Sequence, residues 1–173
     1  MEGSVEYPPD LQEGHEKQEG QEEEPHEELS GEFYVEILNG KNLIAEEAQS
    51  ETYCVVLLSH NPTTIMKTAN SNNAMNPEWK HLDKFVLQIK REEIYDIQLV
   101  VQIYNFENGK TLIGESLMEA LEIFASPGEL KYVTLKLKNS EGAEGNFGEV
   151  SLLVSWVPNG EQVPEFKEAF AYF

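Results

Sequence analysis

Six segments of the chain have an apolar residue at every second position, and this alternation constrains the possible fold more than any other feature of the sequence. In the first segment, the apolar positions are Phe33, Val35 and Ile37. Because successive side chains of a β-strand point to opposite faces of a sheet, a period of two predicts strands that bury one face. The segments span residues 32–38, 52–58, 84–90, 97–104, 132–138 and 149–156, and two shorter apolar runs at residues 63–68 and 111–116 bring the expected strands to eight.

A helix is expected at only one place. Ser116 followed by Glu119 has the spacing of a capping box, and the segment MEALEIFA (residues 118–125) continues from there. Many short strands with few helical stretches are typical of an antiparallel sandwich. The sequence therefore predicts an all-β fold in which one short helical insert lies between two strands.

The first 30 residues differ in composition from the rest of the chain. They contain 11 acidic residues and one lysine, whereas residues 31–157 contain 18 acidic and 10 basic residues. A segment so rich in charge and so poor in branched apolar residues cannot bury enough surface to offset the entropy lost on ordering. We therefore predict a disordered, flexible acidic tail at residues 1–30. It would either keep the protein soluble or dock on a basic partner.

The last 16 residues, 158–173, form a second expected tail, which is aromatic. Phe166 and Phe170 lie four residues apart and would share one face of a helix. Tyr172 and Phe173 add further aromatic surface. Two interpretations stay open: the tail folds back on the sandwich, or it docks in a groove of another protein.

The net charge of −20 and the single cysteine restrict the partners and the compartment. Proteins that bind DNA or RNA need Lys and Arg to neutralise phosphates, so nucleic acid is not an expected partner. Cys54 can form no disulfide within the chain, which suits a reducing compartment. We find no secretory signal and no apolar run long enough to cross a bilayer. We expect a soluble, cytoplasmic protein that a membrane-associated or cytoskeletal complex could recruit.

The sequence lacks the motifs of common catalytic sites. It contains no Gly-x-Ser-x-Gly elbow, no Walker phosphate loop and no Gly-x-Gly-x-x-Gly fingerprint. No histidine lies at metal-ligand spacing with another histidine or with Cys54. We therefore expect neither an enzyme nor a bound cofactor.

Four motifs occur in an order that resembles a C2 domain over residues 31–157. They are NGKNLIAEE (residues 39–47), SETYCVVLL (50–58), NPEW (76–79) and IGE (113–115). The resemblance implies an eight-stranded antiparallel sandwich of two four-stranded sheets. It also implies structural roles: Asn76 and Pro77 would set a turn, Trp79 would anchor the loop entering a central strand, and Gly114 would be structural.

Calcium-binding members of the C2 family carry five aspartates at one end of the sandwich. The resemblance places these positions at Glu47, Glu51, Asn105, Glu107 and Thr111, and none of them is an aspartate. Calcium takes about six to eight oxygen ligands, and anionic oxygens supply most of the binding energy. Because Asn105 is neutral and glutamate is longer than aspartate, we expect no tight calcium site. We interpret Asn105 as a turn former.

C2 domains without these aspartates often act as docking modules or bind lipid through a basic sheet face. Such a face would use Lys67, Lys84, Lys131, Lys136 and Lys138, but ordinary solvated lysines give the same pattern. We predict a calcium-independent interaction module that docks on protein partners within a larger assembly. The alternative is a peripheral membrane adaptor that binds phospholipid through calcium loops or the lysine face.

Overall fold

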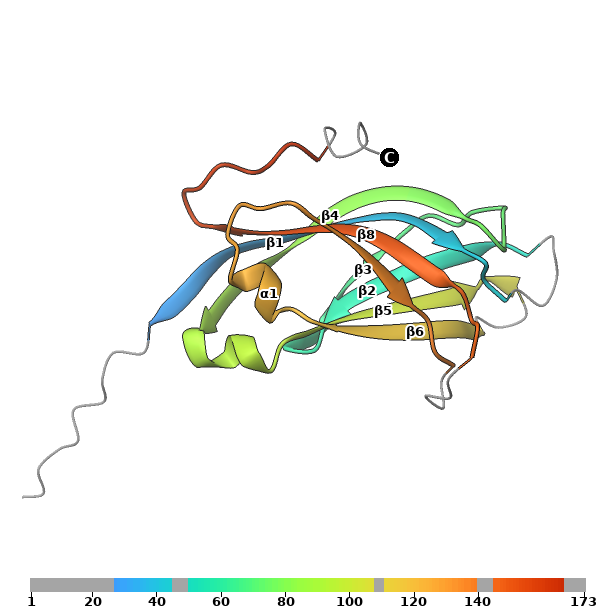
Figure 1. Cartoon of the computed structure of the whole chain (residues 1–173), viewed down its shortest axis with the longest axis horizontal. Coiled ribbons are helices and arrows are strands. Elements are labelled where there is room, and N and C mark those ends of the chain that lie inside the picture. Colours follow the sequence, from blue (N-terminus) through green and yellow to red (C-terminus); the bar gives the residue numbers. More distant parts are fainter. Residues whose placement is uncertain (1–26, 45–49, 108–110, 140–144, 167–173) are drawn as a thin grey trace, which may run out of the picture.

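Two four-stranded antiparallel sheets pack face to face in the computed structural model of the chain (Figure 1), which describes residues 27–44, 50–107, 111–139 and 145–166. The first sheet has the strand order β4-β1-β8-β7, and the second has the order β3-β2-β5-β6. The strands are β1 (Glu28–Lys41), β2 (Thr52–Leu58), β3 (Asn61–Lys67), β4 (Glu78–Lys90), β5 (Gln98–Asn105), β6 (Leu112–Glu119), β7 (Lys131–Lys136) and β8 (Glu149–Pro158).

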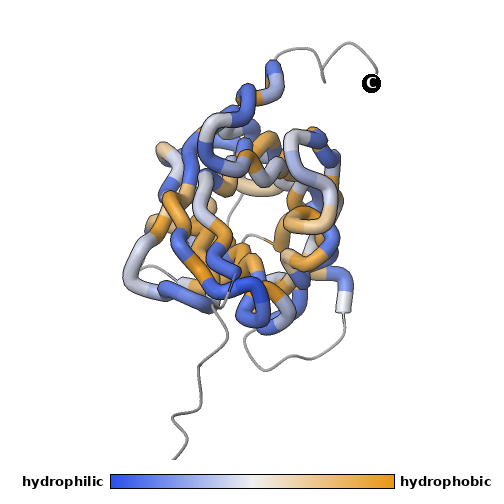
Figure 2. Tube along the Cα trace, turned by 90° about the vertical axis from the view of Figure 1, so that its left-hand side faces the viewer, coloured by the Kyte–Doolittle hydropathy of each residue, from blue (hydrophilic) through white to orange (hydrophobic). Residues whose placement is uncertain are grey.

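The predicted all-β sandwich is confirmed, and the alternating positions form its core. Alternate residues of β1 and β5 have no exposed surface: Phe33, Val35, Ile37, Leu99, Val101 and Ile103. Figure 2 shows hydrophobic and hydrophilic colours changing over short distances along the chain, as the alternation requires. Strand β2 differs because it is buried on both faces. Tyr53, on the face opposite the core residue Cys54, is covered by stacking on Tyr104, with the ring centroids 5.4 Å apart.

The predicted helical insert is helix α1 (Leu121–Phe124), which lies between β6 and β7 and closes one end of the core (Figure 1). The ring centroid of Phe124 lies 5.0 Å from that of Trp156 and 5.5 Å from that of Phe33. A 3-10 helix, η1 (Arg91–Tyr95), connects β4 and β5 and was not expected from the sequence. Within the described residues, no helix is long and apolar enough to span a membrane.

The predicted capping box is wrong. Ser116 and Glu119 both lie in strand β6, where they pair with Val101 and Gln98 of β5. The residue at the N-cap of α1 is Ala120, and its side chain makes no capping hydrogen bond. Pairing with a central strand decides the conformation here, because it satisfies the backbone groups that a helix start would leave open.

Strand β1 extends beyond its predicted segment at both ends. It begins at Glu28, which pairs with Lys90 of β4, so residues 28–30 belong to the sheet rather than to the N-terminal tail. It ends at Lys41, after a bulge in its pairing with both neighbouring strands. Residues 1–26, the remainder of the predicted acidic tail except Glu27, lie outside the described residues.

After β8 the chain turns back over the outer face of the first sheet (Figure 1). There Phe166 is buried against Leu38 and Leu153, and its ring centroid lies 5.8 Å from that of Tyr34. At Phe166, therefore, the C-terminal segment folds back on the sandwich, which is one of the two alternatives for this tail. The other residues of the predicted docking tail, Phe170, Tyr172 and Phe173, lie outside the described residues.

Candidate functional site

The connections β1–β2, β3–β4, β5–β6 and β7–β8 meet at one end of the sandwich, on the right in Figure 1, which we call the loop end. Backbone hydrogen bonds tie the described parts of three of these connections together. Leu43 N donates to Met75 O over 2.9 Å, and Phe106 N donates to Glu51 O over 2.8 Å. The resemblance to C2 domains implies that the five aspartate positions lie at this end, so it is the first candidate site.

Asn105 ends strand β5 at the loop end and is 6% exposed. Its side-chain oxygen Oδ1 accepts a hydrogen bond from Glu107 N over 3.0 Å, and its own backbone N donates to Thr111 O over 2.8 Å. A side-chain oxygen that accepts from the backbone two residues on is an Asx turn. The side chain that stands at one of the five aspartate positions therefore stabilises its own turn.

Of the other four positions, the three that the structure describes offer little to a divalent cation. The carboxylate of Glu51 accepts a hydrogen bond from Asn70 Nδ2 over 2.8 Å. Glu107 and Thr111 are exposed at the rim of the loop end, and Glu47 lies outside the described residues. Within the described ranges, no three His, Cys, Asp or Glu side chains lie close enough together to hold a metal ion.

The loop end is apolar at its surface, which the sequence analysis did not anticipate. Ile44, Met75 and Phe106, from three different connections, are 54%, 51% and 46% exposed. A cavity of about 160 Å³ opens beside Ile44. Its lining is Ile44, Asn105, Thr111, Leu112, Ile113 and Phe147. The signal in the sequence was an additional large apolar residue inside each of these three expected loops, where burial in a core is not available.

Two of the five candidate lysines are held by aromatic and acidic neighbours. The ammonium of Lys67 lies 4.1 Å from the ring centroid of Tyr53, a cation–π contact. Lys84 forms an ion pair with Glu32 and lies 5.6 Å from the ring centroid of Tyr34. Because of this ion pair, the pKa of Lys84 is raised and the pKa of Glu32 is lowered from their ordinary values. The carboxylate of Glu32 thus offsets part of the positive charge that Lys84 could present to anionic lipid.

The structure does not bring the five lysines onto one face. Lys67 ends β3 and Lys84 lies on β4, the edge strands at one side of the sandwich. Lys131 and Lys136 lie on β7, the opposite edge strand of the first sheet, and Lys138 follows it. Lys131 Nζ is engaged in donating to Glu122 O over 2.8 Å. A flat membrane could therefore contact only one of these subsets at a time.

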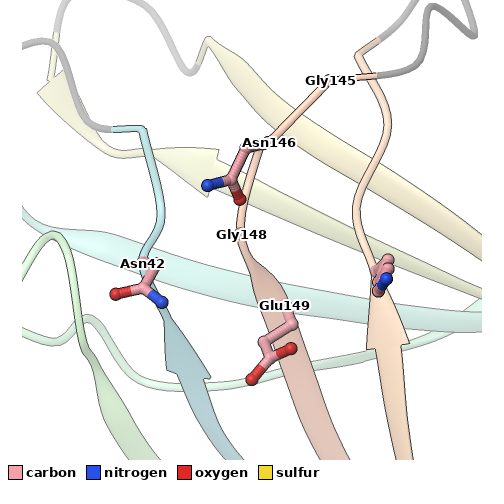
Figure 3. A pocket seen from close by; sticks show the side chains of 6 residues that line it. Asn42, Gly145, Asn146, Gly148 and Glu149 are labelled. Carbon is pink, nitrogen blue, oxygen red and sulfur yellow. The ribbon is translucent and has the colours of Figure 1, made fainter.

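A polar pocket of about 280 Å³ lies next to Lys136, between the start of β8 and the end of β1 (Figure 3). Figure 3 shows the side chains of Asn42, Asn146 and Glu149 around it. Glu149 is the cross-strand partner of Lys136, and both line the pocket, which therefore carries one acidic and one basic side chain. Because of this mixed charge, the pocket is not a dedicated site for an anionic headgroup.

The residues to which the resemblance gave structural roles make hydrogen bonds to neighbouring segments or lie close to them. Asn76 Oδ1 accepts a hydrogen bond from Asn42 N over 3.0 Å, and Pro77 O accepts one from Gly40 N over 2.9 Å. Trp79 Nε1 donates to Thr52 O over 3.3 Å. A Cβ on Gly114 would lie 3.0 Å from Leu137 Cβ. These contacts join the β3–β4 connection and β6 to their neighbours.

Cys54 is not a candidate nucleophile. Its side chain has no exposed surface, and burial raises the pKa of its thiol far above the ordinary value. A reactive cysteine requires a lowered pKa and access to solvent. Cys54 therefore has the role of a small apolar core residue.

A family model described as the C2 domain matches residues 31–135. A C2 domain of plant extended synaptotagmin 1 superposes with a TM-score of 0.66 at 20% identity, covering 77% of this chain and 98% of that one. Human GIVD cytosolic phospholipase A2 gives a TM-score of 0.63 at 18% identity, covering 77% of this chain and 17% of that one. CC2D1B gives 0.61 at 18% identity, covering 72% and 54%. A search of curated proteins found no significant match.

At these identities the structural likenesses show a common fold and nothing about partners or substrates. The superposition with the phospholipase covers less than a fifth of that enzyme, so the likeness does not carry over its activity. The family model, by contrast, covers more than half of this chain, and the motifs NPEW and IGE fall within the matched residues. The chain belongs to the C2 domain family.

Proposed function

We propose that this C2 domain is a non-catalytic, calcium-independent module that docks on partner proteins within a larger assembly. The observation that supports the proposal most directly is the state of Asn105. Its amide is neutral, buried and already bonded to Glu107 N. A neutral amide brings no negative charge to this position, and anionic oxygens supply most of the energy of calcium binding.

The glutamates of the loop end do not replace the missing aspartates. Glu51 is bonded to Asn70, and its longer side chain shifts the carboxylate from the position that an aspartate would take. The described domain also has an excess of acidic residues, which disfavours anionic membranes unless cations bridge the gap. Both features favour proteins as the partners.

Affinity capture from cells tests this function. The intact chain is used as bait in buffer with a calcium chelator and in buffer with added calcium. We expect the same proteins to be retained in both, since the contact does not pass through a bound ion. Bait lacking residues 1–26 separates the acidic tail from the domain. Partners that are retained only with calcium would overturn the calcium-independent part of the proposal, and a bait that retains no specific protein would overturn docking itself.

Contact with a membrane is the second candidate function, and the exposed apolar side chains of the loop end favour it. Ile44, Met75 and Phe106 point into solvent from adjacent connections. Exposed apolar residues gathered on one surface mark a site for a protein groove or for the acyl region of a bilayer. The lysine subsets offer less, because they are split between two sides of the sandwich.

Co-sedimentation with vesicles of phosphatidylcholine and phosphatidylserine decides between the two functions. We expect less than about a tenth of the protein to pellet, with or without calcium, because the protein and the vesicles are both anionic. Phe106→Glu is the variant that tests apolar insertion, and the double variant Lys136→Glu/Lys138→Glu is the matched test of the lysines. Pelleting that requires calcium, or that either variant abolishes, would favour the membrane adaptor.

A further inference from the structure

The outer face of the first sheet carries a cluster that is separate from the main core. Leu38 and Leu153 are 6% and 2% exposed there, and Phe166 packs on them. Partly buried Tyr34 and Leu130 complete the cluster. We call these four residues of the sandwich, Tyr34, Leu38, Leu130 and Leu153, the Phe166 site.

A single side chain fills this site. Residues 159–165 lead to it from the end of β8, and most of them are exposed. Their described backbone hydrogen bonds join Asn159 N to Ser30 O and Glu161 N to Pro158 O, both at the start of the segment. Val163 in its middle is 39% exposed. The segment is therefore attached at its beginning and at Phe166, with little burial between.

The face around the site holds two buried polar side chains that lack hydrogen-bond partners among the described residues. They are the carboxylate oxygen Oε2 of Glu36, which is 8% exposed, and the hydroxyl of Ser155, which is fully buried. Glu36 lies on β1 opposite Leu153 of β8, and Ser155 lies opposite Tyr34. Both groups thus border residues that Phe166 contacts.

An unpartnered buried carboxylate is unfavourable unless a cation or a hydrogen-bond donor reaches it. Burial raises the pKa of Glu36, as expected for a carboxyl group without a cationic neighbour. Two charged groups on this face, Glu32 and Lys84, are already paired with each other. The face therefore offers an aromatic site beside an acidic acceptor that a cationic donor would satisfy.

We propose that the Phe166 site is a docking site for peptides in which an aromatic residue is followed by lysine or arginine, and that the chain's own Phe166 occupies it until such a peptide displaces it. The inference rests on the proposed docking function and names one surface for it. The aromatic ring of the partner takes the place of the Phe166 ring on Leu38, Leu153 and Tyr34. Its cation donates to Glu36 Oε2.

The chain's own sequence supplies the probe. Lys167 follows Phe166, so a fluorescein-labelled peptide of residues 160–173 carries the required aromatic–cation pair. Binding is measured by fluorescence anisotropy to the full-length chain and to its Phe166→Ala variant. In the unmodified chain the probe can bind only the fraction of molecules whose site is not occupied by Phe166, which lowers its apparent affinity. We therefore expect the Phe166→Ala variant to bind the probe roughly tenfold more tightly. Val163→Ala, on the exposed part of the same segment, should bind like the unmodified chain.

The cationic part of the proposal has its own test. Glu36→Gln, introduced into the Phe166→Ala chain, should weaken binding of the probe roughly fivefold, because hydrogen bonds to charged partners are the stronger ones. The same change should leave a probe with alanine in place of Lys167 unaffected. A probe with alanine in place of Phe166 should not bind. Equal affinity of the unmodified and Phe166→Ala chains, or an unaltered affinity in the Glu36→Gln variant, would overturn the proposal.

Two further measurements keep the test independent of variant folding and of dimerisation. In amide NMR spectra of the unmodified chain, excess unlabelled probe should shift the signals of Tyr34, Leu38 and Leu153, and shifts confined to the loop end would overturn the proposal. Sedimentation should show a monomer. A dimer that Phe166→Ala dissolves would mean that a second copy fills the site. If the probe does not bind at this site while the affinity capture still retains partner proteins, the proposed docking function would hold but would use another surface.

Discussion

We expect the substitution Gly31→Val to lower the free energy of unfolding by about 3 kcal/mol. A Cβ at Gly31 would lie 2.4 Å from Val157 O, 2.8 Å from Trp156 Cη2 and 2.9 Å from Pro158 Cα. Two of these atoms belong to the backbone of β8, which cannot move without breaking its pairing with β1. The indole of Trp156 is 1% exposed and has no space into which to retreat.

Thermal unfolding followed by circular dichroism measures this effect. For a folded domain of this size, we expect a melting temperature about 10 °C below that of the unmodified chain. Ser30→Val is the matched control, because Ser30 is the preceding residue of β1 and points to the opposite face. It should change the melting temperature by no more than about 2 °C. Equal melting temperatures for the two variants would contradict the close approach of β1 and β8.

The second large effect is expected at Glu36, where a substitution should stabilise the fold. We expect Glu36→Met to raise the free energy of unfolding at pH 7 by about 1–2 kcal/mol, because it removes a buried carboxylate that lacks full hydrogen bonding. Methionine has similar length and adapts to irregular space. Urea unfolding measures the gain. The same variant should lose affinity for the aromatic–cation probe, so stability and binding would change in opposite directions.

The pH dependence of this effect follows from the raised pKa of Glu36, which is caused by burial. A carboxyl group whose pKa is higher in the folded state destabilises the fold above that folded pKa, and this cost disappears below the unfolded pKa. The neutral variant Glu36→Gln should therefore be more stable than the unmodified chain at pH 7, and its advantage should shrink as the pH falls towards about 4.3. Comparing the two proteins cancels the contributions of the other carboxylates. An advantage that stays constant with pH would show that Glu36 is not buried as a charge.

The strands and the core could be predicted because each depends on local pattern. Phe33, Val35 and Ile37 reveal a buried face by their spacing alone, and the structure buries all three. The same alternation puts Glu36 on the opposite face of β1, which the pattern does not predict to be buried, yet Glu36 is buried. Phe166, far along the chain, returns to that face and packs on Leu153, the cross-strand partner of Glu36. The alternation of residues within one strand cannot predict a contact with a residue so distant in the sequence.

Two further features depended on tertiary placement in the same way. Ser116 and Glu119 have the chemistry of a helix start, but pairing with β5 holds them in a strand. The sequence positions of the five lysines do not show on which side of the sandwich each one lies. Only the strand order shows that β4 and β7 are the opposite edges of the first sheet. The loop-end positions were located by resemblance, because family motifs fix their order along the chain. The disorder expected of residues 1–26 and the cytoplasmic location stay predictions.

Isothermal calorimetry of the full-length chain with calcium tests the central claim most directly, namely that the loop end has no divalent cation site. We expect only the heat of dilution up to about 1 mM free calcium, since Asn105 is bonded to its own turn and Glu51 to Asn70. A calcium-binding C2 domain titrated in the same buffer serves as the positive control. A saturable heat at micromolar calcium that the double variant Glu47→Gln/Glu107→Gln abolishes would contradict the account.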